Sequence, residues 1–292
     1  MTPLRQRMLH ELQRRNYSPS TIRGYLNAVS QFAEHFHRSP EQLGPEHLRR
    51  YQRYLLQEKK LAPSTVEMRI SALRFLYKRT LRRRDLAFDD LIFPKVPQKL
   101  PIVLSQEEVV RLIDSAPNRL YRILLLLLYA TGARRAEAAR IMVEDIDSQR
   151  MVIHIRQGKG AKDRDVPLSP KLLEELRSWW RWKKPQGYLF PSTEGHRGTD
   201  QPISDKTVWN ACHAAATRAG LRKKIHPHTL RHSYATHLLE AGADLRTIQI
   251  LMGHERLEDT TVYLQLSRRH LHAAVNPLEQ IALPAVEEDR RR

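Results

Sequence analysis

Three prolines within eight residues, Pro94, Pro97 and Pro101, interrupt this chain after its first third. Proline fixes its backbone φ and lacks the N–H that a helix or sheet needs, so an extended linker is expected there. The 292 residues are enough for two ordinary domains. The expected layout is a helical domain over residues 1–94, a linker over 95–103, a second domain over 104–283 and a disordered tail over 284–292.

The segment before the linker has the pattern of four or five amphipathic helices. One is expected to start at Ser18, a capping residue followed by proline, because apolar residues then recur at helical spacing as far as Phe36. Another is expected to start within residues 40–49, and a third repeats the serine cap within residues 62–66.

The segment after the linker combines helices with a short hairpin. Residues 104–108 form a capping box that opens a helix, and residues 122–132 are apolar all round, as in a buried helix that ends at a glycine. A further helix is expected from Arg134 to Met142. Residues 151–156 and 164–168 read as two strands joined by a glycine-rich turn. The predicted fold class is mainly α with a small antiparallel β-sheet.

The charge of the chain points to a polyanionic partner. Lys and Arg total 50 against 32 Asp and Glu, a net charge of +18, and nucleic acid is the usual partner of so basic a protein. Residues 1–94 hold 18 basic and 9 acidic side chains, so one third of the chain carries half of the net positive charge. A DNA-clamping surface is therefore expected there, with a solvated helix face as the alternative for each residue. The candidates are Arg49, Arg50, Arg53, Lys59, Lys60, Arg82, Arg83 and Arg84.

Other features bear on location and cofactors. The longest apolar run, residues 123–130, is too short to span a bilayer, and the first residues lack the apolar stretch of a signal peptide, so no membrane partner is expected. Cys212 is the single cysteine, and no Cys/His spacing suggests a metal site. We expect neither metal nor cofactor, and the single cysteine favours a reducing, intracellular location.

The last third of the chain carries the groups for phosphodiester chemistry. It contains His228, Arg231, His254 and, nine residues further on, Tyr263. Arginine can neutralise phosphate charge, histidine can move protons near neutral pH, and a tyrosine hydroxyl can attack phosphorus. Any one of these residues could equally be a packing residue, and it is the ordered set at this spacing that indicates strand cleavage without a metal.

Together with Thr-Gly-Ala-Arg-Arg-Ala-Glu at residues 131–137 and Gly-Lys-Gly at residues 158–160, these motifs resemble those of the tyrosine recombinases, or phage-integrase family, over nearly the whole chain. The resemblance implies a helical SAM-like core-binding domain followed by a catalytic domain. It also implies a site-specific recombinase that cleaves and rejoins DNA through a 3′-phosphotyrosine intermediate, without metal or ATP. The implied site consists of Arg134, Lys159, His228, Arg231, His254 and the nucleophile Tyr263, with Glu137 as acidic support.

The resemblance suggests a role for each group. Arg134 and Arg231 would hold the non-bridging phosphate oxygens and stabilise the charge of the transition state. A phenol with an ordinary pKa of about 10 needs a base near pH 7, and His228 is the predicted base. His254 would bind the phosphate or support the nucleophile, and Lys159 is the predicted acid for the leaving 5′-oxygen.

Several neighbours compete for these roles. Arg135 adjoins Arg134, and alignment with the family's motif, together with helix phase, favours Arg134. Lys162 competes with Lys159, which is favoured by the glycines on either side of it.

The segment around His228 holds three more histidines, His226, His232 and His237. His232 is the strongest rival because it lies one helical turn after His228. Each of the three is expected to pack, cap or face solvent rather than to catalyse.

The implied partner is double-stranded DNA with inverted-repeat core sites. Recombination joins two duplexes through four active sites, so a tetramer on DNA is expected, with a second recombinase or an accessory factor as a further possible partner. The amphipathic segment 268–281 would dock either on its own domain or on a neighbouring subunit. Topoisomerase activity, a DNA-binding relative without catalysis and a metal-dependent transposase are the alternatives.

Overall fold

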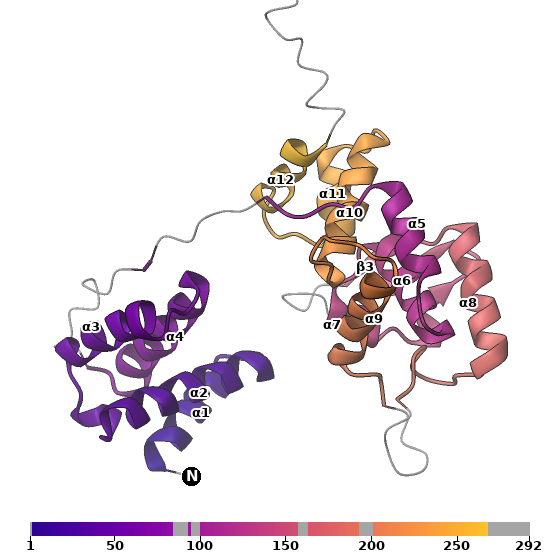
Figure 1. Ribbon diagram of the computed structural model, residues 1–292. Helices are drawn as coiled ribbons and strands as arrows, with labels where there is room; N and C mark the ends of the chain where they lie inside the picture. Colours follow the sequence, from indigo (N-terminus) through magenta and orange to yellow (C-terminus); the bar gives the residue numbers. More distant parts are fainter. Residues whose placement is uncertain (1, 84–92, 95–99, 157–162, 193–200, 268–292) are drawn as a thin grey trace, which may run out of the picture. The chain divides into compact units, whose positions relative to one another are not determined.

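The computed structural model describes residues 2–83, 93–94, 100–156, 163–192 and 201–267, and its chain divides into two compact units, Met1–Lys99 and Leu100–Arg292 (Figure 1). The division falls within the proline-rich segment expected as a linker, of which residues 95–99 lie outside the described ranges. The amphipathic segment 268–281 and the tail after it also lie outside them.

The described part of the first unit is helical. Its elements are α1 (Pro3–Arg14), α2 (Pro19–Phe36), a 3-10 turn (Pro40–Gln42), α3 (Pro45–Arg53), α4 (Pro63–Phe75), and π-helical turns that prolong α3 (Tyr54–Glu58) and α4 (Leu76–Thr80). Ser18 caps α2 as predicted, its hydroxyl accepting from the Thr21 amide. The predicted serine cap of α4 is wrong: Pro63 takes the first helical position, so Ala62 stands at the cap and supplies no side-chain hydrogen bond.

The core of the first unit orients α3. Leu48 and Tyr51 on that helix are buried, and the Tyr51 ring meets Phe32 of α2 edge to face at 5.0 Å between centroids. Because these two residues hold one face of α3 inward, the arginines on its other face lie at the surface. Arg49, Arg50 and Arg53 are all exposed.

The second unit contains the remaining described elements. Its first half has α5 (Gln106–Asp114), α6 (Arg119–Thr131), α7 (Arg135–Ala139), a 3-10 turn (Val143–Asp145), β1 (Ile146–Asp147), β2 (Val152–Ile155) and β3 (Arg164–Pro167). Its second half has α8 (Pro170–Lys183), α9 (Asp205–Arg218), α10 (Pro227–Glu240), α11 (Leu245–Met252) and α12 (Glu258–Leu266). The mainly helical fold class with a small antiparallel sheet is confirmed. None of the described helices is long and apolar enough to cross a membrane.

Two predicted helix boundaries are confirmed in this unit and one is wrong. Ser105 forms the predicted capping box of α5, and α6 ends at Gly132 in the left-handed conformation. The helix expected to reach Met142 ends at Ala139. The chain then becomes extended, and the Leu189 amide donates to the Ile141 carbonyl at 2.8 Å, which replaces a further helical turn.

The sheet is antiparallel in the order β1-β2-β3. Ile153 pairs with Val166 and Ile155 with Arg164, and alternation turns Ile153, Ile155 and Val166 into the core. The predicted hairpin is present, whereas the two-residue β1 is too short to leave an alternating pattern in the sequence.

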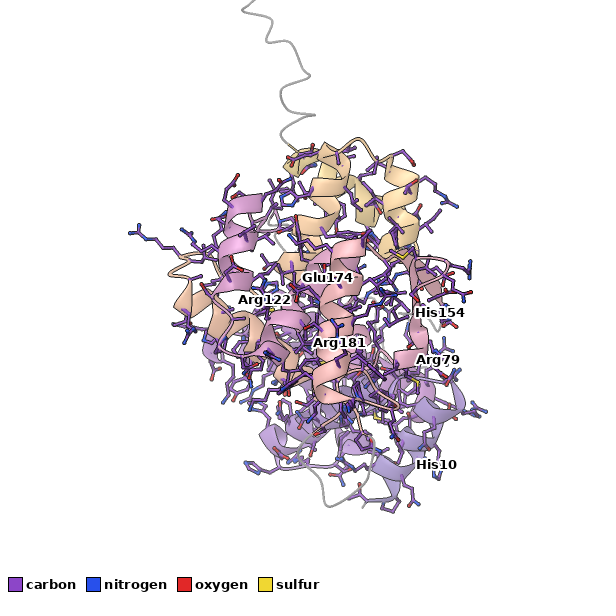
Figure 2. The ribbon with its side chains drawn as sticks, turned by 90° about the vertical axis from the view of Figure 1, so that its right-hand side faces the viewer. His10, Arg79, Arg122, His154, Glu174 and Arg181 are labelled. Atoms are coloured by element: carbon purple, nitrogen blue, oxygen red, sulfur yellow. The ribbon has the colours of Figure 1, made fainter. Side chains whose placement is uncertain are left out.

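Helix α10 lies in the interior of the second unit, next to α6, α9, α11 and α12 (Figure 1). By contrast α8 lies on the outside, where Figure 2 shows Glu174 and Arg181 along its outer face and His154 of β2 at one flank. Most of α10 is buried, including Leu230, Arg231 and Tyr234. Because α10 is buried, the charged side chain of Arg231 lies in the interior of the unit.

Candidate active site

Arg231 is the buried cation around which the site is built. It lies in the middle of α10 with 3% of its surface exposed, and its two terminal nitrogens donate to the carbonyls of Gly132 and Met252. Burial lowers the pKa of Arg231 to about 9, with the positive charge of Arg134 acting in the same direction. Because this pKa is still above 7, the Arg231 guanidinium is a cation at pH 7, and the two carbonyl dipoles stabilise its charge.

Arg134 approaches the same place from the start of α7. Its guanidinium donates to the Gly253 carbonyl at 2.9 Å and to a Glu137 carboxylate oxygen at 2.8 Å. Glu137 also accepts from the Arg134 amide at 2.8 Å and so caps α7. Arg135 is exposed, 3.8 Å from Asp205, so the geometry brings Arg134 to the site and leaves Arg135 outside it.

A third arginine that the sequence did not single out completes the cluster. Arg164 of β3 donates to both Glu137 oxygens, at 2.7 and 3.2 Å, and through Nε to the Leu251 carbonyl at 2.8 Å. Its side chain is 7% exposed. Burial would raise the pKa of Glu137, but hydrogen bonds and charge from Arg164, with help from Arg134, lower it to about 2. One feature of the sequence could have indicated Arg164. Alternate residues of a strand face the same side, so Arg164 shares the inward face of β3 with Val166.

The three guanidinium groups meet at the C-terminal end of α11. Arg164, Arg231 and Arg134 donate to the successive carbonyls of residues 251, 252 and 253. A helix C-terminus presents unpaired carbonyls and partial negative charge, which favours cations there. Since a guanidinium has five N–H donors, Arg134 and Arg231 keep donors beyond these carbonyl contacts, as anion binding requires.

His254 follows directly after this helix end. Gly253 takes the left-handed conformation, at φ 60°, and turns the chain so that the His254 Nδ1 lies 2.9 Å from the Thr260 hydroxyl. The His254 ring stacks nearly parallel to that of Tyr263, at 15° and 6.3 Å between centroids. Burial, with Arg231 and Arg134, lowers the pKa of His254 to about 4, so the imidazole is neutral at pH 7.

Tyr263 lies on α12 and is 1% exposed. Its hydroxyl oxygen is 3.2 Å from Nδ1 of His232. Burial raises the pKa of the Tyr263 hydroxyl to about 12, against the lowering effect of Arg231 and Arg134. The nine-residue spacing in the sequence therefore places the tyrosine close to the arginine cluster, and it adds a contact with His232 that was not expected.

The other histidines of α10 have separate surroundings. His228 is exposed on the first turn, with its ring centroid 6.4 Å from that of His232; partial desolvation by the surrounding protein, with the charge of Arg231, lowers its pKa. His226 is exposed before the helix. His237 faces elsewhere, with Nδ1 2.8 Å from the Tyr129 hydroxyl.

The remaining predicted residues are only partly described. Lys159, Lys162 and Arg84 lie outside the described residues. Arg83 is half-buried and donates to the Leu43 carbonyl at 3.0 Å, which ties it to the fold of the first unit. The exposed candidates are Arg49, Arg50, Arg53, Lys59, Lys60 and Arg82. Within the described part of the chain, no cluster of three His, Cys, Asp or Glu side chains is arranged to hold a metal ion.

The buried Arg231 and the half-buried Arg134, a tyrosine and flanking histidines on a mainly helical scaffold are the groups that a phosphoryl-transfer site with a tyrosine nucleophile needs. Residues 103–270 match the model of the phage integrase family, and residues 4–85 match that of the phage integrase N-terminal SAM-like domain. The chain belongs to the phage integrase family, the tyrosine-type site-specific recombinases that act on DNA.

Curated relatives agree with this assignment, and a solved structure has the same fold. The chain is 47% identical over 286 residues to "Putative integrase/recombinase y4qK" of Sinorhizobium fredii, covering 98% of this chain and 91% of that protein. It is 35% identical over 281 residues to tyrosine recombinase XerA of Pyrococcus furiosus, covering 93% and 94%. The fold matches XerH recombinase bound to its palindromic difH substrate, with a TM-score of 0.72 and 22% identity over 91% of this chain and 82% of that one.

Proposed function

We propose that this recombinase cleaves one DNA strand by in-line attack of the Tyr263 hydroxyl on the scissile phosphate. Attack links the tyrosine to the 3′-phosphate and releases a free 5′-hydroxyl. A second 5′-hydroxyl then attacks the phosphotyrosine and rejoins the strand to a new partner. Because the phosphotyrosine link conserves the energy of the phosphodiester, no ATP is required.

The observation that carries the proposal is the position of Tyr263 beside the buried Arg231 and the half-buried Arg134. Electrostatic interactions couple its hydroxyl to Arg231 and Arg134, and both arginines hold fixed positions on the α11 carbonyls. Fixed donors aimed at a phosphate stabilise the charge of the transition state without reorganisation. They supply the neutralisation that a metal supplies in other phosphoryl transferases.

The other predicted groups are assigned around this centre. His254, neutral and stacked on Tyr263, would donate a hydrogen bond to the phosphate. His228, exposed one turn before Arg231, remains the sequence-based candidate for the base. Lys159 is proposed as the acid that protonates the leaving 5′-oxygen. Glu137 supports the site by holding Arg134 and Arg164.

The proposed partner is duplex DNA with an inverted-repeat core site, bound through the exposed cations of the first unit. The palindromic substrate of the XerH complex supports the repeat arrangement. Four strands are cut and exchanged in recombination, so four copies are expected on the joined DNA, with a second recombinase or an accessory factor able to join them. Such a protein would act on the nucleoid in a bacterial cytoplasm.

Covalent trapping tests the proposal. The protein would be incubated with a pool of nicked duplexes with randomised core sequences, in EDTA, and the products separated under denaturing conditions. An adduct is expected from the wild type and from Tyr234→Phe, a control tyrosine on α10, but not from Tyr263→Phe. Sequencing the trapped DNA would define the core site. Tight binding in gel shifts without an adduct would contradict the proposal and indicate a binding-only relative.

A further inference from the structure

His232 is the histidine that contacts the nucleophile. Its Nδ1 lies 3.2 Å from the Tyr263 hydroxyl oxygen, and the two ring centroids are 5.9 Å apart. His228, which the sequence favours as the base, has its ring 6.4 Å from that of His232 on the exposed side of the helix turn. His254 lies alongside Tyr263 and directs its Nδ1 to Thr260 instead.

We propose that His232 is the catalytic base that takes the tyrosine proton through Nδ1, an inference that rests on the proposed strand cleavage by Tyr263. As the bond from the Tyr263 oxygen to phosphorus forms, its proton passes to His232. The bond from phosphorus to the 5′-oxygen breaks, and that oxygen takes a proton from the acid, for which Lys159 is the candidate. Rejoining reverses each transfer, so the His232 proton returns to the departing tyrosine.

The surroundings of His232 keep its imidazole unprotonated at neutral pH. Burial lowers the pKa of His232 to about 4, and the neighbouring His228, Arg231 and His226 act in the same direction. The imidazole is therefore unprotonated at pH 7 and, with its hydrogen on Nε2, presents the Nδ1 lone pair to the hydroxyl.

The timing of the transfer follows from the acidity of the two groups. The pKa of Tyr263 is about 12 and that of His232 about 4, so the free phenol does not ionise onto this imidazole. Bonding to phosphorus removes the basicity of the phenol oxygen. Transfer must therefore accompany formation of the oxygen–phosphorus bond, which is the condition for general-base catalysis.

The fold gives a matched control. His237 lies on the same helix five residues further on, but its Nδ1 faces the Tyr129 hydroxyl at 2.8 Å. His232→Asn keeps a polar group that can hold the Tyr263 hydroxyl but cannot take its proton, and His237→Asn makes the same change away from the nucleophile. His232→Gln provides a second variant, and thermal unfolding would show that each protein is folded.

The test is the single-turnover rate of covalent adduct formation in EDTA, on a nicked duplex with the core sequence recovered by trapping. We expect His232→Asn to slow the step about 10²- to 10⁴-fold with unchanged DNA affinity, and His237→Asn to stay within a few-fold of wild type. Replacing Tyr263 by a fluorinated, more acidic tyrosine should shrink the deficit of His232→Asn. Wild-type rates in both His232 variants would overturn the assignment.

A second substrate separates the base from the acid. In a duplex with a 5′-bridging phosphorothiolate at the scissile position, the sulfur leaves without a proton, so a variant lacking the acid is rescued and one lacking the base is not. His232→Asn should remain slow on this duplex. Rescue to the wild-type rate would instead place His232 at the leaving group and overturn the inference. If the wild type itself forms no adduct on any duplex, it is the proposed strand cleavage that fails.

Discussion

At the residue scale, the site depends on one carboxylate that holds two cations. Glu137 is buried, with 5% of its side chain exposed, and it bridges Arg134 and Arg164. The exposed carboxylate of Glu144, 2.9 Å from Arg156, offers a surface pair for comparison. Removing one partner from a buried pair leaves the other charge without compensation, whereas a surface pair contributes little.

Glu137→Gln should therefore lower the free energy of unfolding of the second unit by about 3 kcal/mol at pH 7, and Glu144→Gln by less than about 1 kcal/mol. Urea unfolding followed by tryptophan fluorescence measures this unit alone, because Trp179, Trp180, Trp182 and Trp209 all lie in it. Equal losses in the two variants would show that Glu137 does not bind the arginines as described.

The same carboxylate predicts a pH dependence. Its folded pKa of about 2 lies below the ordinary 4.5, so its contribution is complete above pH 4.5 and is lost as the pH falls toward 2. The lost contribution is on the order of 3 kcal/mol. The stability gap between wild type and Glu137→Gln should accordingly close over this range. A gap that stays constant down to pH 2 would argue against the assignment.

At the scale of elements, the ends of helices position the site. Gly132 ends α6 with φ 60°, its carbonyl accepts from Arg231, and α7 starts three residues later. A Cβ on Gly132 would lie 2.5 Å from a ring carbon of Tyr234 on α10. The close approach of α6 to α10 thus requires glycine both for backbone conformation and for space.

Gly220 provides a matched comparison, since it has φ 63° and nothing within 4 Å of its added Cβ. Gly220→Ala should cost only the left-handed strain, about 1 kcal/mol. Gly132→Ala should cost about 3 kcal/mol, because overpacking against Tyr234 adds to the strain, and it should slow strand cleavage by displacing the Arg231 contact. Urea unfolding of both variants measures the difference, and similar costs would mean that the α6–α10 contact can relax.

The sequence predicted interactions between neighbouring residues, but not contacts between residues far apart in the chain. Ser18, Ser105 and Gly132 act on neighbouring residues, and the sequence predicted their roles correctly. The contact of Arg164 with Glu137 spans 27 residues, and that of His232 with Tyr263 spans 31. Such pairings depend on how β3 and α12 pack against their neighbours, which no local pattern encodes.

At the scale of the whole molecule, the cations proposed to clamp DNA and the proposed catalytic groups lie in different units. The exposed cations of α3 belong to the first unit, and the arginine cluster belongs to the second. The sequence could predict this division from its prolines and charge counts. Which cations contact phosphate could not be predicted, because a solvated arginine and a phosphate-binding arginine have the same local sequence.

Salt dependence can identify the contacts. If Arg53 on α3 binds a phosphate, Arg53→Ala should reduce the slope of log affinity against log salt by about 0.9. Arg14, exposed on α1 and paired with Glu11 at 3.0 Å, is the control, and Arg14→Ala should leave the slope unchanged. Gel shifts with one duplex at several salt concentrations measure both. An unchanged slope for Arg53→Ala would remove that residue from the clamp.

Strand cleavage by this protein is proposed to pass through a covalent bond between Tyr263 and DNA, and the most direct measurement is to identify that bond. The trapped adduct would be digested with protease and nuclease, and the modified peptide sequenced by mass spectrometry. We predict a nucleotide attached through its 3′-phosphate to Tyr263, with a free 5′-hydroxyl on the released strand. A modification on another residue, or a link through a 5′-phosphate, would contradict the account.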